Sequence, residues 1–263
     1  MELLFSYKLK PIEQCAVGEK EYCWHYLSDS FFYFQLGSEK IFEYTTDFSA
    51  KYPKEFAESR YADYYFDQIF SDLLVIGRET LSPIPQHIFR YIDTFQKYDL
   101  KYRKYLTICR QDIDDLLNDY INENLFFLGG LDTGYFVNSP RLQFFHVEDK
   151  MIIQYDCTQL FNKKAKKKIW TAGKGTIILS YKDCINQLEI LANSFLKDME
   201  KQVSDADSFL KKVGIVSIHT PNLIDESRQR RQSYLKSLVE IKNGAEDTPS
   251  VDWDKIEAVL KKL

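Results

Sequence analysis

Glycine and proline are scarce in this sequence, with 10 and 7 of 263 residues. So few of either leave little room for long flexible linkers or for glycine-rich loops that cradle a cofactor. No apolar run approaches the roughly 18 uninterrupted residues of a membrane span. The N-terminal segment has an early acid, Glu2, and no small-residue cleavage site, unlike a signal peptide. We therefore expect a cytoplasmic protein with no membrane partner and no cofactor.

Cysteine pairs at metal-binding spacing are also missing. The five cysteines are odd in number and widely scattered: Cys15, Cys23, Cys109, Cys157 and Cys184. Structural zinc sites use paired Cys or His residues at turn spacing, with four ligands in all. Disulfide frameworks use even numbers of cysteines. The pattern therefore predicts reduced thiols and no metal site, and it fits a reducing compartment.

The chain carries only a small excess of negative charge. The net charge is −4, made of −8 in residues 1–150 and +4 in residues 151–263. A dedicated nucleic-acid-binding protein usually carries a strongly basic face. We therefore expect no nucleic-acid partner.

Aromatic residues are abundant, with 19 Phe, 18 Tyr and 3 Trp. They favour strands and large cores, and tyrosine is also common at protein interfaces. Period-two patterns and turn residues predict strands at 2–9, 22–27, 31–36, 40–45, 133–138, 141–147, 150–156 and about 175–181. Helical periodicity predicts helices at 54–77, 85–95, 98–122, 182–203 and 221–242, and a last short helix capped by Asp252.

This order, strands then helices and again strands then helices, predicts an α+β fold with antiparallel, aromatic-rich sheets packed by helices. We place one globular domain at 1–204 and a helical C-terminal extension at 205–263. An echo between the hairpins near 31–48 and 142–161 leaves open two similar halves, 1–123 and 124–204. Two hairpins built by the same rules explain that echo more simply.

One continuous core is predicted from the periodic apolar positions of these elements. Its members are Trp24, Phe32, Phe34, Phe66, Phe70, Phe144, Leu191 and Phe195.

Short motifs that resemble catalytic or metal sites are incomplete. Asp132-Thr133-Gly134 has the letters of an aspartic protease triplet, but that chemistry needs two triplets and the chain has one. We interpret Asp132 as the cap of a turn. The acidic run from Asp112 places Leu116 and Leu117 where a calcium loop needs an oxygen ligand and a glycine.

Two charged clusters are the candidate partner-binding residues. The basic one comprises Lys163, Lys164, Lys166, Lys167 and Lys168 with the aromatic Trp170 beside it. The acidic one comprises Asp112, Asp115 and Asp119. Clustered charges can steer a partner of opposite sign, and an aromatic side chain can anchor it. If the protein is an enzyme, the polar candidates nearest the predicted strand ends are His25, Asp132 and His146.

Seven segments along nearly the whole chain carry a further signal: LKPIEQ (9–14), WHYLSDSFFYFQLG (24–37), RYADYYFDQIFSDLL (60–74), LDTGYF (131–136), PRLQFFHVEDKMIIQYD (140–156), WTAGKGTIILSYKD (170–183) and VDWDKIEAVLKKL (251–263). Taken in order, they resemble an uncharacterised bacterial family of domain-of-unknown-function proteins. Members of that family look like the immunity proteins encoded beside polymorphic toxins. The resemblance implies a protein that binds and neutralises a toxin.

The leading hypothesis is therefore a non-enzymatic, protein-binding module, and more narrowly an immunity protein. The alternatives are a hydrolase-like enzyme whose site is assembled from separated residues, and a protein that binds a small ligand between its sheets and helices. The identity of the partner and the oligomeric state are left open.

Overall fold

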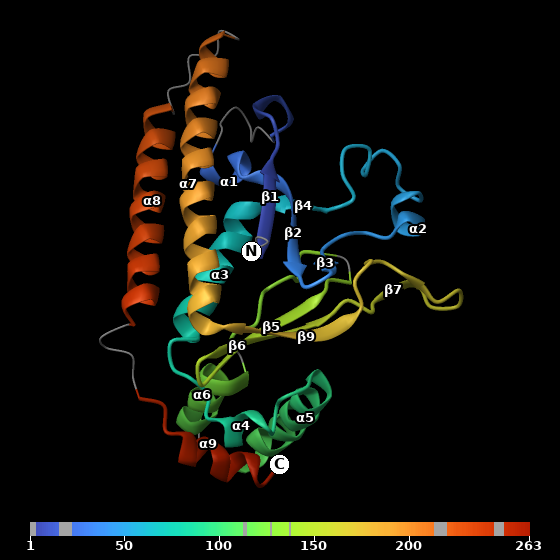
Figure 1. Cartoon of the computed structure of the whole chain (residues 1–263), viewed down its shortest axis with the longest axis vertical. Coiled ribbons are helices and arrows are strands. Elements are labelled where there is room, and N and C mark those ends of the chain that lie inside the picture. Colours follow the sequence, from blue (N-terminus) through green and yellow to red (C-terminus); the bar gives the residue numbers. More distant parts are fainter. Residues whose placement is uncertain are drawn as a thin grey trace.

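Two antiparallel sheets with helices packed around them give the protein an α+β fold, as the sequence predicts (Figure 1). The structure, a computed structural model, describes residues 4–15, 23–112, 115–126, 128–136, 138–212, 220–244 and 250–263. Within these residues, no helix combines the length and the apolar character needed to cross a bilayer.

The strands are β1 (Phe5–Leu9), β2 (Asp29–Leu36), β3 (Glu39–Ile41), β4 (Ala62–Tyr65), β5 (Arg141–Val147), β6 (Lys150–Asp156), β7 (Leu160–Asn162), β8 (Lys167–Lys168) and β9 (Lys174–Ser180). The helices are α1 (Trp24–Leu27), α2 (Thr46–Ser49), α3 (Phe66–Glu79), α4 (Gln86–Phe89), α5 (Phe95–Asp112), α6 (Asp115–Ile121), α7 (Tyr181–Lys212), α8 (Thr220–Asn243) and α9 (Trp253–Leu260). A 3₁₀ turn, η1 (Ile12–Gln14), follows β1, and a π-helical turn, η2 (Asn122–Phe126), follows α6.

The first sheet is built around β2. β1 pairs with one side of β2, and β3 and β4 pair with the other side. Burial alternates residue by residue along β2, because successive side chains of a strand point to opposite faces. The buried face carries Phe32 and Phe34 into the core. Because β1 pairs with β2 alone among the described strands, it is an outer strand of this sheet.

The second sheet has the order β5, β6, β9 and is buried on both faces at β5 and β6. One face contributes Phe144 and Ile153 to a first hydrophobic core, and the other contributes Phe145 and Ile152 to a second. The first core lies among this sheet, the first sheet, α3 and α7. The second lies among α4, α5, α6 and α9, which gather below the second sheet in Figure 1.

The predicted core is confirmed. All eight residues named from the sequence are buried and belong to the first core. Much of the aromatic content goes into edge-to-face ring contacts there, such as Phe66 against Phe195 at 5.2 Å between ring centroids. Contacts of this geometry add stability beyond the burial of their surface.

The carboxylate of Asp67, in the first turn of α3, is almost completely buried, with 4% of its side chain exposed. Trp24 Nε1 of α1 donates to it at 2.8 Å. From α8, Arg230 Nη1 and the Tyr234 hydroxyl donate at 2.9 and 2.5 Å, and His25 Nδ1 lies 3.6 Å away. Burial alone raises the pKa of an aspartate. The hydrogen bonds and the guanidinium charge outweigh that effect and hold the pKa of Asp67 below its ordinary value.

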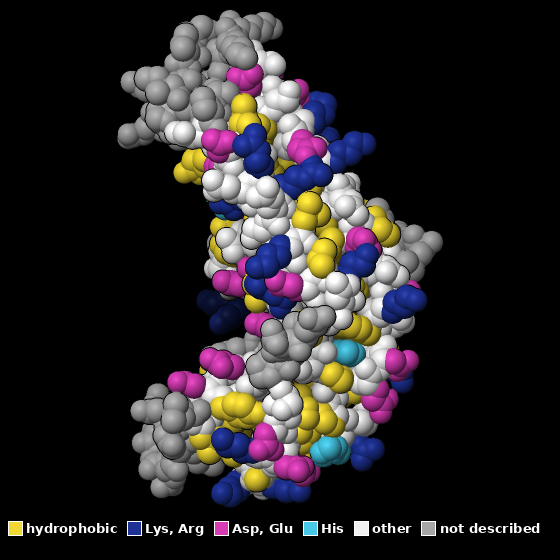
Figure 2. Space-filling model, turned by 90° about the vertical axis from the view of Figure 1, so that its left-hand side faces the viewer, with side chains coloured by type: hydrophobic (Ala, Val, Ile, Leu, Met, Phe, Trp, Pro, Cys, Tyr) yellow, Lys and Arg dark blue, Asp and Glu magenta, His cyan; other side chains and the backbone are white. Residues whose placement is uncertain are grey.

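The long helices α7 and α8 lie side by side on one flank of the molecule (Figure 1). Figure 2 shows basic and acidic side chains interspersed over the face that carries α8. Ion pairs such as Arg230–Glu226 at 3.0 Å and Lys242–Glu189 at 2.7 Å account for part of this mixture. Neither sign of charge dominates that face.

The strand predicted at 22–27 is wrong, because residues 24–27 form α1, while residue 22 lies outside the described residues. Trp24 and Leu27 are fully buried, and the two residues between them are half-buried. A three-residue spacing of buried positions is helical. Ser28 Oγ donates to the carbonyl of His25 at 2.7 Å and closes the turn.

The strand predicted at 133–138 is also wrong, since the described residues there form turns. Asp132 Oδ1 accepts a hydrogen bond from Gly134 N at 2.9 Å. Asn138 has a positive φ of 52°. A side-chain bond to the backbone two residues on competes with extended structure. The interpretation of Asp132 as the cap of a turn is confirmed.

The helix predicted at 54–77 begins late, at Phe66. Residues 62–65 form β4 instead, because pairing with β2 outweighs local helical periodicity. The helix predicted at 85–95 is short and comprises only α4. The strands at 141–147 and 150–156, the helix at 221–242 to within one residue at each end, and the cap at Asp252 are confirmed.

α7 continues to Lys212, so residue 204, the predicted boundary between the globular domain and the extension, falls inside a continuous helix. α8 packs against α7 and α3.

We predict that Asp67→Ala lowers the free energy of unfolding by about 3 kcal/mol, because it removes the buried acceptor that Trp24, Arg230 and Tyr234 share. The exposed pair Asp225–Arg228 on α8, at 2.9 Å, supplies the control: Asp225→Ala should change stability by less than about 1 kcal/mol. Chemical denaturation of both variants measures the difference.

The difference in stability between wild type and Asp67→Ala should also depend on pH. Because the pKa of Asp67 is lower in the folded protein, the stability it contributes is fully present above the ordinary aspartate value of about 3.9 and is lost as the pH falls towards the folded-state value. The gap between wild type and Asp67→Ala should stay constant from neutral pH to about pH 5 and shrink below about pH 4. A gap that widens on acidification would contradict this account.

We also predict opposite results for two adjacent glycines. Gly129 has a φ of +68°, and a Cβ there would lie 1.9 Å from the carbonyl oxygen of Phe144. Gly130 has open space around its Cα. Gly129→Ala should lower stability by about 2 kcal/mol or more, whereas Gly130→Ala should be tolerated. Thermal unfolding of the two variants tests this, and equal melting temperatures would show that the loop relaxes freely.

Candidate functional site

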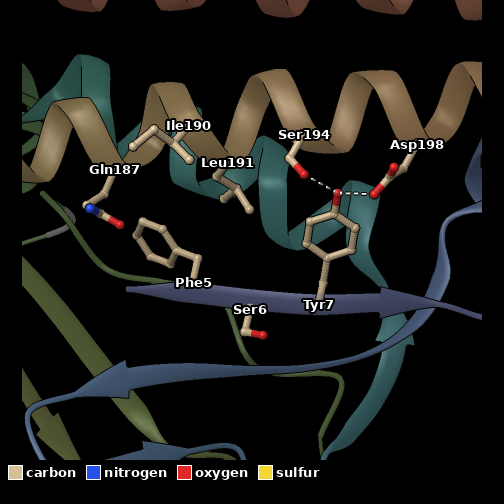
Figure 3. A pocket seen from close by; sticks show the side chains of 8 residues that line it. All are labelled: Phe5, Ser6, Tyr7, Gln187, Ile190, Leu191, Ser194 and Asp198. Carbon is tan, nitrogen blue, oxygen red and sulfur yellow. Dashed lines mark hydrogen bonds between the residues drawn. The ribbon is translucent and has the colours of Figure 1, made fainter. Parts of the chain in front are cut away.

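A groove runs between the free edge of β1 and the adjoining side of α7 (Figure 3). It consists of two hollows of about 170 and 190 Å³ that share Gln187, and we call it the edge groove. The first hollow is lined by Phe5, Ser6, Tyr7, Gln187, Ile190, Leu191, Ser194 and Asp198. The second is lined by Leu4, Gln35, Gly37, Ile177, Leu179, Asp183 and Gln187.

Alternate residues of β1 point their backbone groups away from β2, at the margin of the edge groove. Lys10 N donates to the carbonyl of Asp29 at 2.8 Å, and Gln35 N donates to the carbonyl of Leu4 at 2.9 Å. In an antiparallel ladder every second residue bonds to the neighbouring strand. The even-numbered residues therefore bond to β2, and the N–H and C=O groups of Phe5, Tyr7 and Leu9 point outward. Within the described residues, no strand pairs with that side of β1.

Tyr7 joins β1 to α7 at one end of the edge groove. Its hydroxyl donates to Asp198 Oδ2 at 2.7 Å, and Ser194 Oγ lies 3.3 Å from the hydroxyl oxygen of Tyr7, as Figure 3 shows. Its ring stacks on Phe66 at 4.6 Å. Burial, with the adjacent carboxylate, raises the pKa of Tyr7, so the hydroxyl keeps its proton. This wall of the groove is therefore held in place by both ring packing and hydrogen bonding.

The other end of the edge groove contains an unsatisfied acceptor. Gln35 Nε2 donates to the carbonyl of Gly37 at 2.6 Å, whereas the buried Gln35 Oε1 has no hydrogen-bond partner. Between the two ends, the apolar side chain of Ile190 is 47% exposed on α7. The groove thus offers backbone groups, a free amide oxygen and apolar surface together.

The predicted basic cluster is exposed, but its aromatic anchor is not. The five lysines lie on the β7–β8 hairpin, on the side of the molecule away from α8 (Figure 1). Lys167 pairs with Asp47 at 3.1 Å. Trp170 is fully buried, stacks on Tyr44 at 4.2 Å and donates to the carbonyl of Asn138 at 2.9 Å. The prediction that Trp170 is a surface anchor is therefore wrong: it is a core residue.

The predicted acidic cluster spans two helices. Asp112 ends α5 and Asp115 begins α6, and their side chains lie outside the described part of the structure. Asp119 is exposed on α6.

The three polar candidates for an enzyme occupy separate environments. His25 on α1 is half-buried beside Asp67. His146 on β5 stacks on Tyr181 at 3.7 Å, and its Nδ1 lies 2.7 Å from the carbonyl oxygen of Thr80. Burial lowers the pKa of His146 and favours the neutral ring. Asp132 is exposed in its turn. Each has a partner within its own element or core, and no described contact brings the three together.

Residues 4–259 match the family of unknown function DUF5984. The chain belongs to this family. Both walls of the edge groove, from Leu4 to Asp198, fall within the matched range. No curated protein and no solved structure matches the chain significantly. Membership of DUF5984 names no activity, so the link to toxin neutralisation stays a prediction.

The thiols and carboxylates of this family member form no metal centre within the described residues, where no three His, Cys, Asp or Glu side chains lie together in a way that could hold an ion. Burial raises the pKa of Cys157 and of Cys184 to about 12. Thiols that stay protonated are poor nucleophiles. The residues that line the edge groove offer hydrogen-bonding groups and apolar contact.

Proposed function

We propose that this protein binds a partner protein by adding an extended segment of that partner to the free edge of β1, in the edge groove. The observation that carries the proposal is the outward-facing backbone of Phe5, Tyr7 and Leu9 alongside α7. A strand edge with free N–H and C=O groups is a template for pairing with another chain. Adding a strand beside a helix is a recurring mode of peptide recognition.

The lining of the edge groove sets the character of the bound segment. In a paired strand, alternate side chains point to opposite faces. The side chains on one face of the bound segment would lie against Phe5, Ile190 and Leu191, so they should be apolar. Asp183 and Asp198 line the two ends of the groove, so basic residues at the ends of the segment are favoured. The bound segment is therefore extended, with apolar residues at alternate positions and Lys or Arg flanking them.

A narrower proposal is that the partner is a bacterial toxin, as the family resemblance implies. Co-expression of the toxic domain encoded by a neighbouring gene, with and without this protein, tests it. Equal cell death in both cases would remove toxin neutralisation while leaving strand addition open. A variant with Lys164, Lys166 and Lys167 all changed to Glu tests the basic hairpin as a second contact surface. This variant should protect cells from the toxic domain less well than wild type only if the hairpin steers an acidic partner.

We predict that Ile190→Glu weakens binding of a peptide selected from a random displayed library by at least tenfold, because it removes about 1.5 kcal/mol of apolar contact and adds a third acid to the edge groove. Val239→Glu is the matched control, because Val239 is a similarly exposed apolar residue on α8. Both substitutions alter an exposed side chain, so folding should survive.

Residue-resolved amide exchange distinguishes strand addition from contact through side chains alone. On binding, the amides of Phe5, Tyr7 and Leu9 should exchange more slowly, whereas those of Ser6 and Lys8 are already bonded to β2 and should change little. A binder that is insensitive to Ile190→Glu, or that leaves the three outward amides unchanged, would overturn the proposal. So would a library that yields no binder.

A further inference from the structure

A second hollow, remote from β1, lies where the first turn of α5 meets the second sheet. It has two lobes, of about 600 and 320 Å³, which share Phe95 and Arg141. We call it the polar cleft. Its size is that of a site for a small molecule. It contains none of the residues that line the edge groove.

The floor of the polar cleft consists of two polar rows across the sheet. In one row Gln143, Gln154 and Thr176 are cross-strand partners, and in the next row Arg141, Asp156 and Lys174 are. Both rows lie on the face of the sheet that also carries Phe145 and Ile152 into the second core, since residues two apart on a strand share a face. The apolar part of this face is covered by the helices of the second core, and the polar part forms the cleft.

Gln154, in the polar cleft, has a buried side-chain oxygen with no hydrogen-bond partner. It is only 1% exposed, and its Nε2 donates to the carbonyl of Asp93 at 2.7 Å. That carbonyl can only accept a hydrogen bond, so the orientation of the Gln154 amide is determined. Its Oε1 is then left buried without a hydrogen-bond partner, and Gln154 is one of the residues that line the larger lobe. A buried unpaired oxygen costs about 1–3 kcal/mol, a cost that a bound donor would remove.

The charged groups around Gln154 differ in their availability. Arg141 forms a forked pair with Asp99, with both N–O distances 2.9 Å, and lies over the ring of Phe95 at 4.5 Å. These contacts hold the wall of the cleft against its floor. Lys174 is exposed and, within the described residues, makes no ion pair. Its ammonium group is therefore available to an anion.

We propose that the polar cleft binds a small zwitterion, either an α-amino acid or a dipeptide with one apolar side chain. The ammonium group of the ligand donates to Gln154 Oε1 beside the carboxylate of Asp156, and its carboxylate pairs with Lys174. The apolar side chain enters the smaller lobe, among Tyr98, Phe126 and Leu131. This arrangement gives Gln154 Oε1 a hydrogen-bond donor and pairs the exposed ammonium group of Lys174 with the carboxylate of the ligand.

Calorimetric titration of the full chain tests this with four probes: phenylalanine, phenylalanylglycine, N-acetylphenylalanine and phenylalaninamide. The last two lack the ammonium and the carboxylate charge respectively, and each should bind at least tenfold more weakly than phenylalanine. Saturation by phenylalanine or the dipeptide at millimolar concentration or below is the expected result. No detectable binding of either at about 10 mM, or equal binding of all four probes, would overturn the proposal.

Two variants locate the binding. Lys174→Gln should weaken phenylalanine binding about tenfold and should leave phenylalaninamide unaffected, whereas Lys150→Gln, on an equally exposed lysine at the other end of the sheet, should change neither. Gln154→Leu should weaken both probes. Because Gln154 is buried, thermal unfolding checks that variant first. If it is unfolded, the Lys174→Gln result decides alone, and an unchanged affinity there would overturn the proposal.

Discussion

The double burial of the second sheet is the constraint on which the rest of the structure depends. β5 and β6 bury every residue from Leu142 to Val147 and from Met151 to Tyr155. A sheet covered on both faces needs apolar layers on each side. The two cores supply them, with the first sheet, α3 and α7 on one face and α4, α5, α6 and α9 on the other. α4, α5 and α6 precede this sheet in the sequence, whereas α9 lies near the C-terminal end. All four helices pack against the same face of the sheet.

Both candidate sites arise where that covering ends. At the polar rows of β5, β6 and β9, the segment before α5 and the first turn of that helix lie against the sheet, and the polar cleft forms between them. On the other face, α7 covers the first core but leaves the outer backbone of β1 uncovered, and the edge groove forms beside it. The buried carboxylate of Asp67 supports this second arrangement, since its bonds tie α1 and α8 to α3, and α8 packs on α7. The walls of the edge groove are thus packed elements, and a partner segment would meet a preformed surface.

Much of the fold could be predicted from the sequence, and the misses share a cause. Long periodic segments such as α7 and the β5–β6 hairpin were predictable, because local pattern and tertiary packing agree there. At 22–27 the aromatic alternation favoured a strand, but Trp24 and Leu27 are three residues apart and both reach the core. At 62–65 pairing with β2 overrode helical spacing. Trp170 shows the same limit: neighbouring lysines indicated a surface, and only the fold shows its ring against Tyr44.

Neither candidate site has a sequence signature. The backbone groups of Phe5 and Tyr7 are free because, among the described strands, β1 pairs only with β2. The oxygen of Gln154 is unpaired because the described part of the folded chain places no donor beside it. Both facts depend on tertiary structure. Binding through such groups needs no reactive side chain. Burial keeps the thiols of Cys157 and Cys184 and the ring of His146 neutral, and the ionised carboxylate of Asp67 accepts hydrogen bonds from Trp24, Arg230 and Tyr234. The outward backbone groups of β1 and the amide oxygen of Gln154 are hydrogen-bonding groups held at fixed positions by packed elements, and that is the property on which both proposals, recognition of an extended chain and of a small zwitterion, depend.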